Sequence, residues 1–313
     1  MSKVVVIGAG MMGSGIGAMS ALAGNLTVLV DTTAERAQAG KVKAFLCINE
    51  RVSNQLSGEE AGKTASELLK TSSDLEESLQ GADLVIEAIY ENLEAKQELF
   101  QKIDSVLPAN VPILSNTSGM RITDIAAKAE YYPERTMTAH FWLPAHLVPL
   151  VEVVMWDKTD EVMAEGVKDT LKAWGKAPVL VRKDLPGQLA NRILQVIIRE
   201  AVNIVDMGLA SPEDVDTAVK MGMGIRFPAW GPLEHIDAIG LDLALSVQNT
   251  VLPGLKNNTK NYVLQKMVEE GKNGNKGENH VGFYDWTKRS MKEQMEKRNQ
   301  FIIHALQEIF PCD

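Results

Sequence analysis

The sequence is poor in cysteine and lacks any long uninterrupted apolar run. Its two cysteines, Cys47 and Cys312, lie far apart and form no Cys-x-x-Cys pair. This spacing argues against a disulfide framework and against a zinc site, so we expect no metal. No apolar stretch approaches the ~18 residues that a membrane span requires, and the few apolar residues between Lys3 and the first glycine do not suit a secretory signal. These absences predict a protein of the reducing cytoplasm, away from membranes.

The chain also lacks an excess of positive charge. Its formal net charge is -9 and its pI is near 5.2, so we do not expect it to bind a nucleic acid or an anionic membrane surface. A small anionic ligand remains compatible with this composition, because such a ligand needs only a local pocket of positive potential. At 313 residues the chain is too long for most single cores and suits two domains.

A strand, a glycine turn, a helix and a second strand are predicted in succession near the start of the chain. The β-branched run over 4–7 is typical of a buried parallel strand, and residues 26–30 predict a second one. The turn after the first strand has the pattern Gly-x-Gly-x-x-Gly, and Asp31 ends the second strand. A bare glycine pattern also fits a tight turn without a ligand, but here every flanking element has the offset that favours dinucleotide binding.

Each part of this motif has a physical role in holding a dinucleotide. Gly8 permits the tight turn, Gly10 lets a pyrophosphate approach the backbone, and Gly13 lets the helix pack closely on the strand. The Asp31 carboxylate would accept hydrogen bonds from ribose hydroxyls and repel a 2′-phosphate, which favours NAD over NADP. The cofactor contacts predicted from this segment are Gly8, Gly10, Met11, Met12, Gly13 and Asp31.

Strands that alternate with helices predict an α/β fold, an N-terminal Rossmann-type doubly wound sheet, for residues 1–184. A polar helical hairpin over 34–70 is inserted after the second strand. After residue 184 the apolar residues follow helical spacing, which predicts an all-α domain over 185–313 that binds substrate and forms a homodimer. Further strands are expected over 83–89, 112–116, 136–140, 150–154 and 178–181, and further helices over 91–103 and 288–310.

Two polar residues stand out in the apolar segment 138–154. His140 ends one predicted strand and Glu152 lies in the next. A buried carboxylate without a partner costs several kcal/mol, so Glu152 implies a partner, for which His140 is the obvious candidate. Such a pair could be a structural polar bridge. Beside a hydride acceptor it could instead act as general acid and base in alcohol oxidation, because the carboxylate fixes the tautomer and leaves the other ring nitrogen as a base.

Several segments, in their order along the chain, resemble the 3-hydroxyacyl-CoA dehydrogenase family, which also holds lambda-crystallin and L-gulonate, L-carnitine and pyridine-alcohol dehydrogenases. The segments are GAGMMG, EAIYENLEAK, SNTSG, HFWLP, LVEVV, DLPGQLANR, MGMGIRFPAWGPLEHIDAIGLD and GFYDW. The resemblance extends to about Trp286. It implies NAD-dependent oxidation of a 3-hydroxy acid or acyl compound to the 3-keto compound.

The resemblance also implies roles for individual residues. His140 is the catalytic acid/base and Glu152 its partner, while Ser118 and Asn191 position the substrate. Without the family pattern, Ser118 would be interpreted as a helix cap and Asn191 as a helix-surface residue. The residues implied to hold the nicotinamide half of NAD or to line its cleft are Glu91, Lys96, Asn116 and Ala88.

Two features depart from the family pattern and bear on the substrate. Leu143 replaces an asparagine that donates to substrate, so the pocket there should favour an apolar or aromatic group or be reorganised by Trp142. In the hairpin, Cys47 and Asn54 replace a serine and a lysine that contact CoA, and residues 32–80 carry more acids than bases. A free hydroxy acid or small alcohol is therefore at least as compatible as a CoA thioester.

A non-catalytic, crystallin-like protein that holds NAD is an alternative to the enzyme, although the complete set of Ser118, His140, Glu152 and Asn191 argues against it. His146 has no trusted counterpart in the family; of a contact with substrate and a loop histidine in water, the second is the preferred interpretation.

Overall fold

The computed structural model describes residues 1–309, which form two compact units. The first contains residues 1–190 together with the chain from Lys297, and the second is Asn191–Glu296. The division therefore falls a few residues after the boundary predicted at residue 184. Cys312 and the predicted end of the last helix lie outside the described residues.

The last helix, α13 (Met291–Ile309), differs from its predicted place in the second domain. From Lys297 onward it belongs to the first unit. The physical reason is apolar packing, because Ile303 and Leu306 are buried in a cluster with Leu56 and Leu147.

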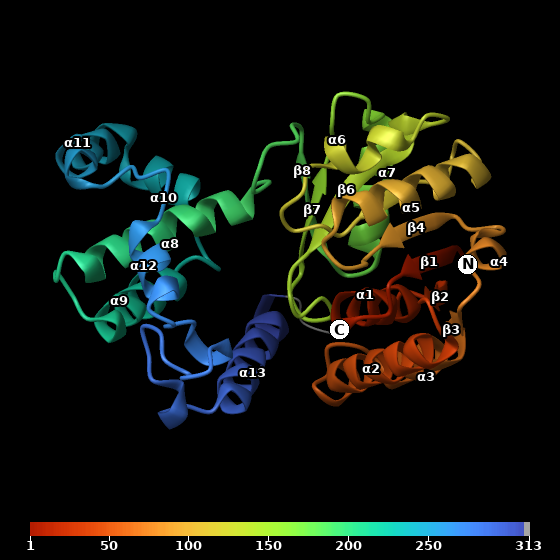
Figure 1. The fold of residues 1–313 in the computed structure, drawn as a ribbon, viewed down its shortest axis with the longest axis horizontal. Coiled ribbons are helices and arrows are strands. Elements are labelled where there is room, and N and C mark those ends of the chain that lie inside the picture. The colour runs from red at the N-terminus through yellow and green to blue at the C-terminus, as the bar shows by residue number, and fades with distance from the viewer. Residues whose placement is uncertain (310–313) are drawn as a thin grey trace. The chain divides into compact units, whose positions relative to one another are not determined.

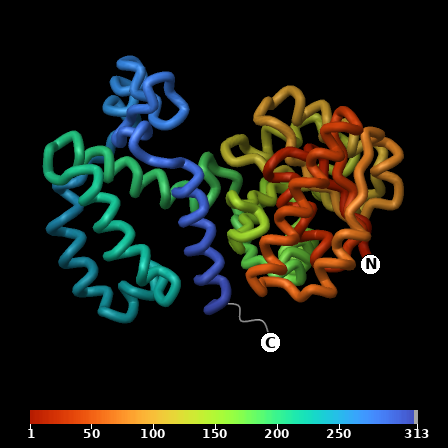
Figure 2. The backbone as a smooth tube through the Cα atoms, turned by 90° about the horizontal axis from the view of Figure 1, so that it is seen from below, coloured from red at the N-terminus to blue at the C-terminus, as the bar shows by residue number. Residues whose placement is uncertain are grey.

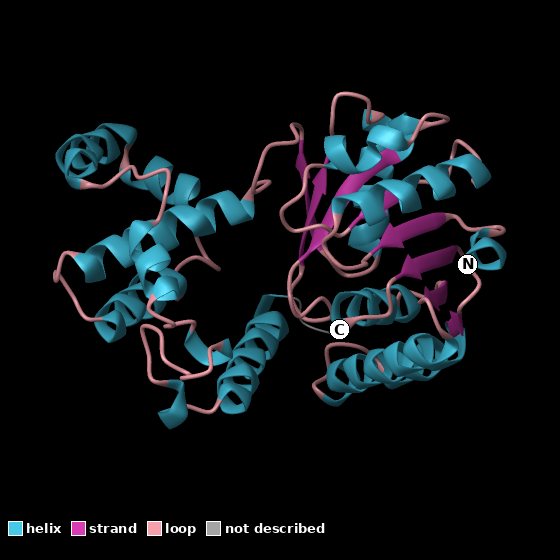
Figure 3. Cartoon of the chain, viewed as in Figure 1, coloured by secondary structure: helices cyan, strands magenta, loops and turns pink. Residues whose placement is uncertain are grey.

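The first unit is built on one eight-stranded sheet with the order β3-β2-β1-β4-β5-β6-β7-β8 (Figures 1 and 3). Neighbouring strands are parallel from β3 to β6, β7 is antiparallel to β6, and β8 is parallel to β7. The strands are β1 (Lys3–Ile7), β2 (Leu26–Val30), β3 (Leu69–Ser72), β4 (Leu84–Glu87), β5 (Ile113–Ser115), β6 (Thr136–Phe141), β7 (Leu150–Val154) and β8 (Ala177–Val181). The Rossmann-type doubly wound sheet is confirmed.

Helices cover both faces of this sheet because alternate strand residues point to opposite sides. Val4 and Val6 of β1 join one apolar cluster, whereas Val5 and Ile7 join another. The helices of this unit are α1 (Met11–Leu22), α2 (Ala34–Ser53), α3 (Glu59–Leu68), α4 (Leu75–Leu79), α5 (Leu93–Val106), α6 (Ile122–Ile125) and α7 (Glu161–Ala173), with short 3-10 turns at Ala126–Lys128 and Pro133–Arg135. Figure 2 shows α1, α2 and α3, in red to orange, side by side.

The inserted hairpin is present as α2 and α3. The Thr33 side chain caps α2 by accepting from the backbone N–H of Arg36, and the chain turns between Asn54 and Gly58 before α3 begins. The sequence prediction extended the hairpin to residue 70 and missed β3, which starts at Leu69 and pairs in parallel with β2. This edge strand has a single buried apolar side chain, so its pattern gives little signal.

The second unit is helical, as predicted. Its elements are α8 (Ala190–Asp206), α9 (Pro212–Ala218), a π-helical turn (Val219–Gly224), α10 (Pro232–Ile239), α11 (Leu241–Val251) and α12 (Tyr262–Glu269), with 3-10 turns at Leu252–Gly254, Gly274–Lys276 and Trp286–Lys288. Among residues 1–309, no helix is long and apolar enough to cross a membrane.

Candidate active site

The turn between β1 and α1 is closely packed except at one glycine. Gly8 has a φ of 101°, and a Cβ there would lie 2.5 Å from the Ala88 carbonyl oxygen. A Cβ on Gly13 would lie 1.8 Å from the Gly8 carbonyl oxygen, so the helix can approach the turn only without a side chain. A Cβ on Gly10 would meet nothing within 4 Å, so the backbone there is open to a ligand.

A cleft of about 660 Å³ opens at the carboxyl ends of β1, β2 and β4. Helix α1 begins at this cleft without an acidic residue in its first turn and without a side-chain cap. Its first backbone N–H groups are therefore available to a phosphate. The wall of the cleft includes the predicted residues Gly8, Gly10, Met11, Met12, Asp31 and Ala88. These features fit a dinucleotide.

Asp31 is held in place at the end of β2. Its Oδ2 accepts a hydrogen bond from the Ala9 N–H at 3.0 Å, and its Oδ1 accepts from the Thr32 N–H at 2.8 Å. Arg36 lies 3.3 Å from the same Oδ1, although the arginine side chain is largely exposed. The carboxylate is thus held at the cleft by backbone donors, and Oδ2, which accepts only from Ala9 among the described residues, retains capacity to accept from a ribose hydroxyl.

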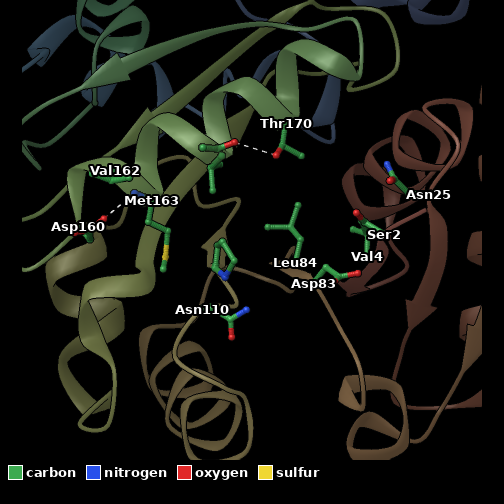
Figure 4. A pocket seen from close by; sticks show the side chains of 13 residues that line it. Ser2, Val4, Asn25, Asp83, Leu84, Asn110, Asp160, Val162, Met163 and Thr170 are labelled. Atoms are coloured by element: carbon green, nitrogen blue, oxygen red, sulfur yellow. Dashed lines mark hydrogen bonds between the residues drawn. The ribbon is translucent and has the colours of Figure 1, made fainter.

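A second cavity, of about 380 Å³, lies at the opposite, amino-terminal edge of the sheet (Figure 4). Its acidic residues are already engaged in the fold. Asp83 accepts from the Lys3 backbone N–H at 2.7 Å, and Asp160 caps α7 by accepting from the Met163 N–H at 2.7 Å. Both carboxylates of this cavity therefore serve as hydrogen-bond acceptors within the fold.

His140 and Glu152 are direct partners across the antiparallel pair β6 and β7. Because directly opposed residues place their side chains on the same face, the imidazole and the carboxylate meet. His140 Nδ1 lies 2.8 Å from Glu152 Oε2, and the side chains are 8% and 0% exposed. The pair is a buried polar contact at the end of two strands.

Glu152 is surrounded by donors. Its Oε1 accepts from the backbone N–H groups of Leu189 and Ala190 at 2.9 and 2.7 Å, and its Oε2 accepts from the Trp142 indole N–H at 3.0 Å as well as from His140. Burial alone would raise the pKa of Glu152, but the hydrogen bonds from His140, Ala190, Trp142 and Leu189 lower it to about 2. The carboxylate is therefore ionised at neutral pH.

Ser118 connects His140 to a second acid. Its Oγ lies 3.1 Å from His140 Nε2, and its backbone N–H donates to Glu91 Oε1 at 2.9 Å. Thr117 Oγ1 also donates to Glu91, at 2.9 Å. The loop after β5 thus brings three of the predicted residues, Ser118, His140 and Glu91, into one network.

Lys96 is in this network but is not part of the cleft wall. Its Nζ is buried, 2.6 Å from Glu87 Oε1 and 3.4 Å from Glu91 Oε2. Sequence reasoning missed Glu87, which is fully buried and also accepts from Ser115 Oγ at 2.6 Å. The available signal was one acid inside the apolar strand segment 83–89. Lys96 reaches the loops of the site through Glu91, so its predicted contact with NAD stays a prediction.

The two predicted asparagines occupy different units. Asn116 is buried at the end of β5, and its Oδ1 accepts from the Phe141 backbone N–H at 2.8 Å, which fixes the end of β6 beside it. Asn191 is the first residue of the second unit, where its Oδ1 accepts from Gln195 Nε2 at 3.1 Å. Its contact with substrate stays a prediction.

The loop between β6 and β7 presents Trp142 and Leu143. Trp142 is half-buried and its ring centroid lies 5.6 Å from that of His140. Leu143 is 45% exposed, so the position where the family has an asparagine is an apolar surface. From the sequence Trp142 was expected only as a residue that could reorganise the pocket at Leu143, and its bond to Glu152 has no local sequence signal.

The interpretation of His146 as a loop histidine in water was wrong. Its side chain is buried, and its Nε2 lies 2.7 Å from Glu50 Oε2 on α2. Burial lowers the pKa of His146, against the opposing effect of Glu50. Arg51 of the same helix donates to the His146 carbonyl oxygen at 2.8 Å, so the loop is bound to the hairpin at two points.

Residues 3–185 match the family model for the 3-hydroxyacyl-CoA dehydrogenase NAD binding domain, and residues 187–286 match that for its C-terminal domain. Together with the doubly wound sheet and its cleft, these matches define the class: the protein is an NAD-dependent dehydrogenase that acts on CH–OH donors. The chain belongs to the 3-hydroxyacyl-CoA dehydrogenase family. Its activity is thus of the NAD-dependent 3-hydroxyacyl-CoA dehydrogenase type, with a small-molecule substrate.

Two kinds of relative resemble this chain. It is 36% identical over 298 residues to a probable 3-hydroxybutyryl-CoA dehydrogenase of Bacillus subtilis, covering 92% of this chain and 98% of that protein. It is 33% identical over 255 residues to the 5-formyl-3-hydroxy-2-methylpyridine 4-carboxylate 5-dehydrogenase of Mesorhizobium japonicum. This match covers 82% of this chain and 81% of that protein. A crystal structure of a dehydrogenase for that pyridine acid, described as an NAD+-dependent dismutase, superimposes with a TM-score of 0.88 over the whole of both chains at 28% identity.

Proposed function

We propose that the protein reversibly oxidises a secondary alcohol, at the carbon β to a carboxyl or acyl group, with His140 and Glu152 as its acid/base dyad. The observation that carries this proposal is the position of the imidazole, with Nδ1 2.8 Å from Glu152 and Nε2 3.1 Å from Ser118. One ring nitrogen is thereby assigned to the carboxylate and the other faces a hydroxyl group, as general-base catalysis requires.

The mechanism follows from the charges. Because Glu152 is ionised, it accepts the Nδ1 hydrogen and leaves the Nε2 lone pair free. NAD supplies the acceptor for the hydride. His140 Nε2 takes the hydroxyl proton, Glu152 stabilises the imidazolium that forms, and Ser118 Oγ hydrogen-bonds the substrate oxygen. Asn191 is proposed to orient the same oxygen. In the reverse direction, the protonated His140 returns the proton.

The hairpin favours a substrate without CoA. Cys47 is packed against the main core, and burial raises its pKa to about 12, so it stays a neutral thiol and offers no positive charge to a polyanion. Asn54 Nδ2 donates to the Glu50 carbonyl oxygen at 2.7 Å. Together with the acid excess of residues 32–80, these contacts support a free hydroxy acid or small alcohol as the second candidate. The exposed Leu143 beside Trp142 suits an aromatic substrate, such as the pyridine acid named for the Mesorhizobium relative.

The test is NADH formation with a matched set of alcohols. The set contains 3-hydroxybutyryl-CoA, free 3-hydroxybutyrate, carnitine, gulonate and the pyridine aldehyde acid in its hydrated form. We expect turnover with at least one compound, and a His140→Ala variant to lose on the order of 10²–10⁴-fold in rate with nearly unchanged NAD affinity. The exposed His304 provides the control variant His304→Ala, which should keep its rate. If no compound is turned over, the result would favour the non-catalytic, crystallin-like alternative. If His140→Ala keeps its full turnover, the proposed role of the dyad would be contradicted.

We also propose that the second unit forms a homodimer. Among residues 191–296, all of which the structure describes, only Val202, Asn203 and Gly277 are buried. A lone helical unit does not leave so many apolar side chains in water, and a second copy of the same surface would cover them. The exposed large apolar residues on α10 and α11 are Leu233, Ile239, Leu241, Leu243, Leu245, Val247 and Val251. A cytoplasmic location stays a prediction.

Sedimentation analysis tests this dimer. The unmodified protein should sediment as a dimer, and Leu245→Glu should shift it toward the monomer or abolish its folding. Lys266→Glu, an exposed charge reversal in α12, is the control and should not change the mass. A monomeric, cooperatively folded wild-type protein would overturn the proposal.

A further inference from the structure

Two donors share one oxygen of the catalytic carboxylate. Glu152 Oε2 accepts from His140 Nδ1 at 2.8 Å and from the Trp142 indole N–H at 3.0 Å. The rings of these two donors are neighbours, with centroids 5.6 Å apart and planes inclined by 50°. The other carboxylate oxygen is held by two backbone N–H groups. Trp142 is therefore the only side chain besides His140 that the described residues place on Glu152.

We propose that Trp142 is a positioning residue whose indole N–H sets how strongly Glu152 holds a proton on His140. This inference rests on the proposed function of the dyad. An indole N–H is a donor that cannot lose its hydrogen at physiological pH. It places a fixed positive dipole end on the oxygen that also faces the imidazole. Part of the carboxylate's charge is thereby balanced by Trp142, and less of it is available to stabilise imidazolium.

The direction of the effect follows from this competition. When the indole donor is removed, Oε2 becomes a better acceptor and holds the protonated imidazole more tightly. His140 in the variant is then expected to hold its proton to a higher pH than in the unmodified protein, so a smaller fraction of the ring is neutral and able to act as a base at a given pH. With the donor in place, oxidation can proceed at lower pH.

Other charges near the dyad remain constant in this comparison. Glu91 reaches His140 only through Ser118, and Lys96 is paired with Glu91. Lys176 Nζ donates to the Val148 carbonyl oxygen at 3.0 Å and lies 6.0 Å from the Phe141 ring. Because Trp142 makes none of these contacts, we expect a change in the titration of His140 to report on the indole donor itself.

The experiment measures that titration directly, without turnover. The chain has five histidines, so isotope-labelled histidine rings can be followed by NMR across pH, with His140→Ala identifying the His140 signal. In Trp142→Phe, which keeps an aromatic ring but no N–H, the midpoint of His140 should rise by roughly 0.5–1 pH unit. Trp142→Leu should shift the His140 midpoint in the same direction. It replaces Trp142→Phe in the experiment if that variant does not fold.

The matched control is Trp156→Phe. Trp156 also donates its indole N–H inside the sheet, to Thr136 Oγ1 at 3.0 Å, but it does not contact Glu152. Its removal should leave the His140 midpoint unchanged. An unchanged or lowered midpoint in Trp142→Phe would mean that the indole only packs against the dyad, and the inference would be abandoned.

Kinetics separates this inference from the proposed function. With a substrate found in the NADH screen, the pH profile of oxidation in Trp142→Phe should move upward by the same amount, with the high-pH rate retained. A raised midpoint without any dehydrogenase activity would contradict the proposed function alone. Activity with an unmoved midpoint and an unmoved profile would contradict the role of Trp142 alone.

Discussion

Glu152→Gln is the substitution that most directly tests the dyad. The carboxylate is fully buried and uses both oxygens as acceptors. A glutamine side chain has one oxygen and one NH2 group. It can therefore accept either from the two backbone donors or from the His140 and Trp142 side chains, but not from both pairs. The backbone donors of Leu189 and Ala190 cannot rotate away, and we expect the amide oxygen to face them. The NH2 group then faces His140 and Trp142.

Two effects reduce the rate in this variant. The imidazolium loses its counter-charge, and Nδ1 of His140 must now accept a hydrogen bond, which moves the ring hydrogen to Nε2 beside Ser118. A base with its hydrogen on the reacting nitrogen is in the wrong tautomer, a defect worth about 10³–10⁴-fold in related triads. We expect kcat for oxidation to fall by that order, which corresponds to about 4–5.5 kcal/mol in the activation free energy.

The same substitution changes how stability depends on pH. The pKa of Glu152 is lowered from 4.5 to about 2 in the folded protein. Its carboxylate therefore contributes stability that is present above the unfolded pKa and is lost as the pH falls toward 2. Glutamine has no such contribution. The free energy of unfolding of the wild type should exceed that of the variant most above about pH 5, and the difference should narrow in acid.

The assay compares two glutamate-to-glutamine variants. Glu50 forms the other buried-histidine pair, 2.7 Å from His146, and contacts neither Ser118 nor Glu152 in the described network. Glu50→Gln should therefore keep its kcat within roughly threefold, whereas Glu152→Gln should lose it, with NAD affinity retained in both. Equal losses in the two variants, or a Glu152→Gln variant with near wild-type turnover, would refute the reasoning.

Three further predictions concern the cofactor turn and a buried lysine. Asp31→Arg should reduce the preference for NAD over NADP by at least roughly tenfold, measured as the ratio of kcat/KM values. An unchanged ratio would show that Asp31 does not discriminate against NADP. Gly13→Ala should abolish NAD binding in calorimetry or prevent folding, because its Cβ would meet the Gly8 carbonyl oxygen at 1.8 Å; tight NAD binding would contradict this packing. Burial lowers the pKa of Lys176 from 10.5 to about 7, so the unfolded chain binds more protons between these values and stability should rise with pH there by up to about 1.4 kcal/mol per unit. Lys176→Met should lack that slope in urea unfolding, and an identical slope would show that the ammonium is not buried.

The sequence predicts those parts of the fold whose signal is local. β1, the glycine turn, α1 and β2 follow from adjacent residues, and the hairpin follows from its polar helical pattern and the break before Gly58. β3 was missed because only Leu69 in it is buried and apolar. The docking of α13 on the first unit could not be predicted, since its apolar contacts join segments from opposite ends of the chain.

The same distinction applies to the site. His140 and Glu152 are close in sequence, and strand pairing sets them opposite each other. The partner of His146, by contrast, lies 96 residues away in sequence on α2, so no local pattern indicates that this histidine is buried. Glu87 was missed for a related reason, because no neighbouring residue in its strand indicates that its partner is Lys96 on α5.

The contacts also connect the proposed acid/base dyad to the loops at the cofactor end of the sheet. Glu87 holds Lys96 inside the unit, and Lys96 holds Glu91 near the end of β4. Glu91 accepts the Ser118 backbone N–H, while the Ser118 hydroxyl contacts His140. Each bond fixes the position of the next group, so loss of a buried charge at the far end should loosen Ser118 before it disturbs the strands. In such a variant the substrate KM and the rate would change together, whereas a variant of Glu152 would change the rate and its pH dependence.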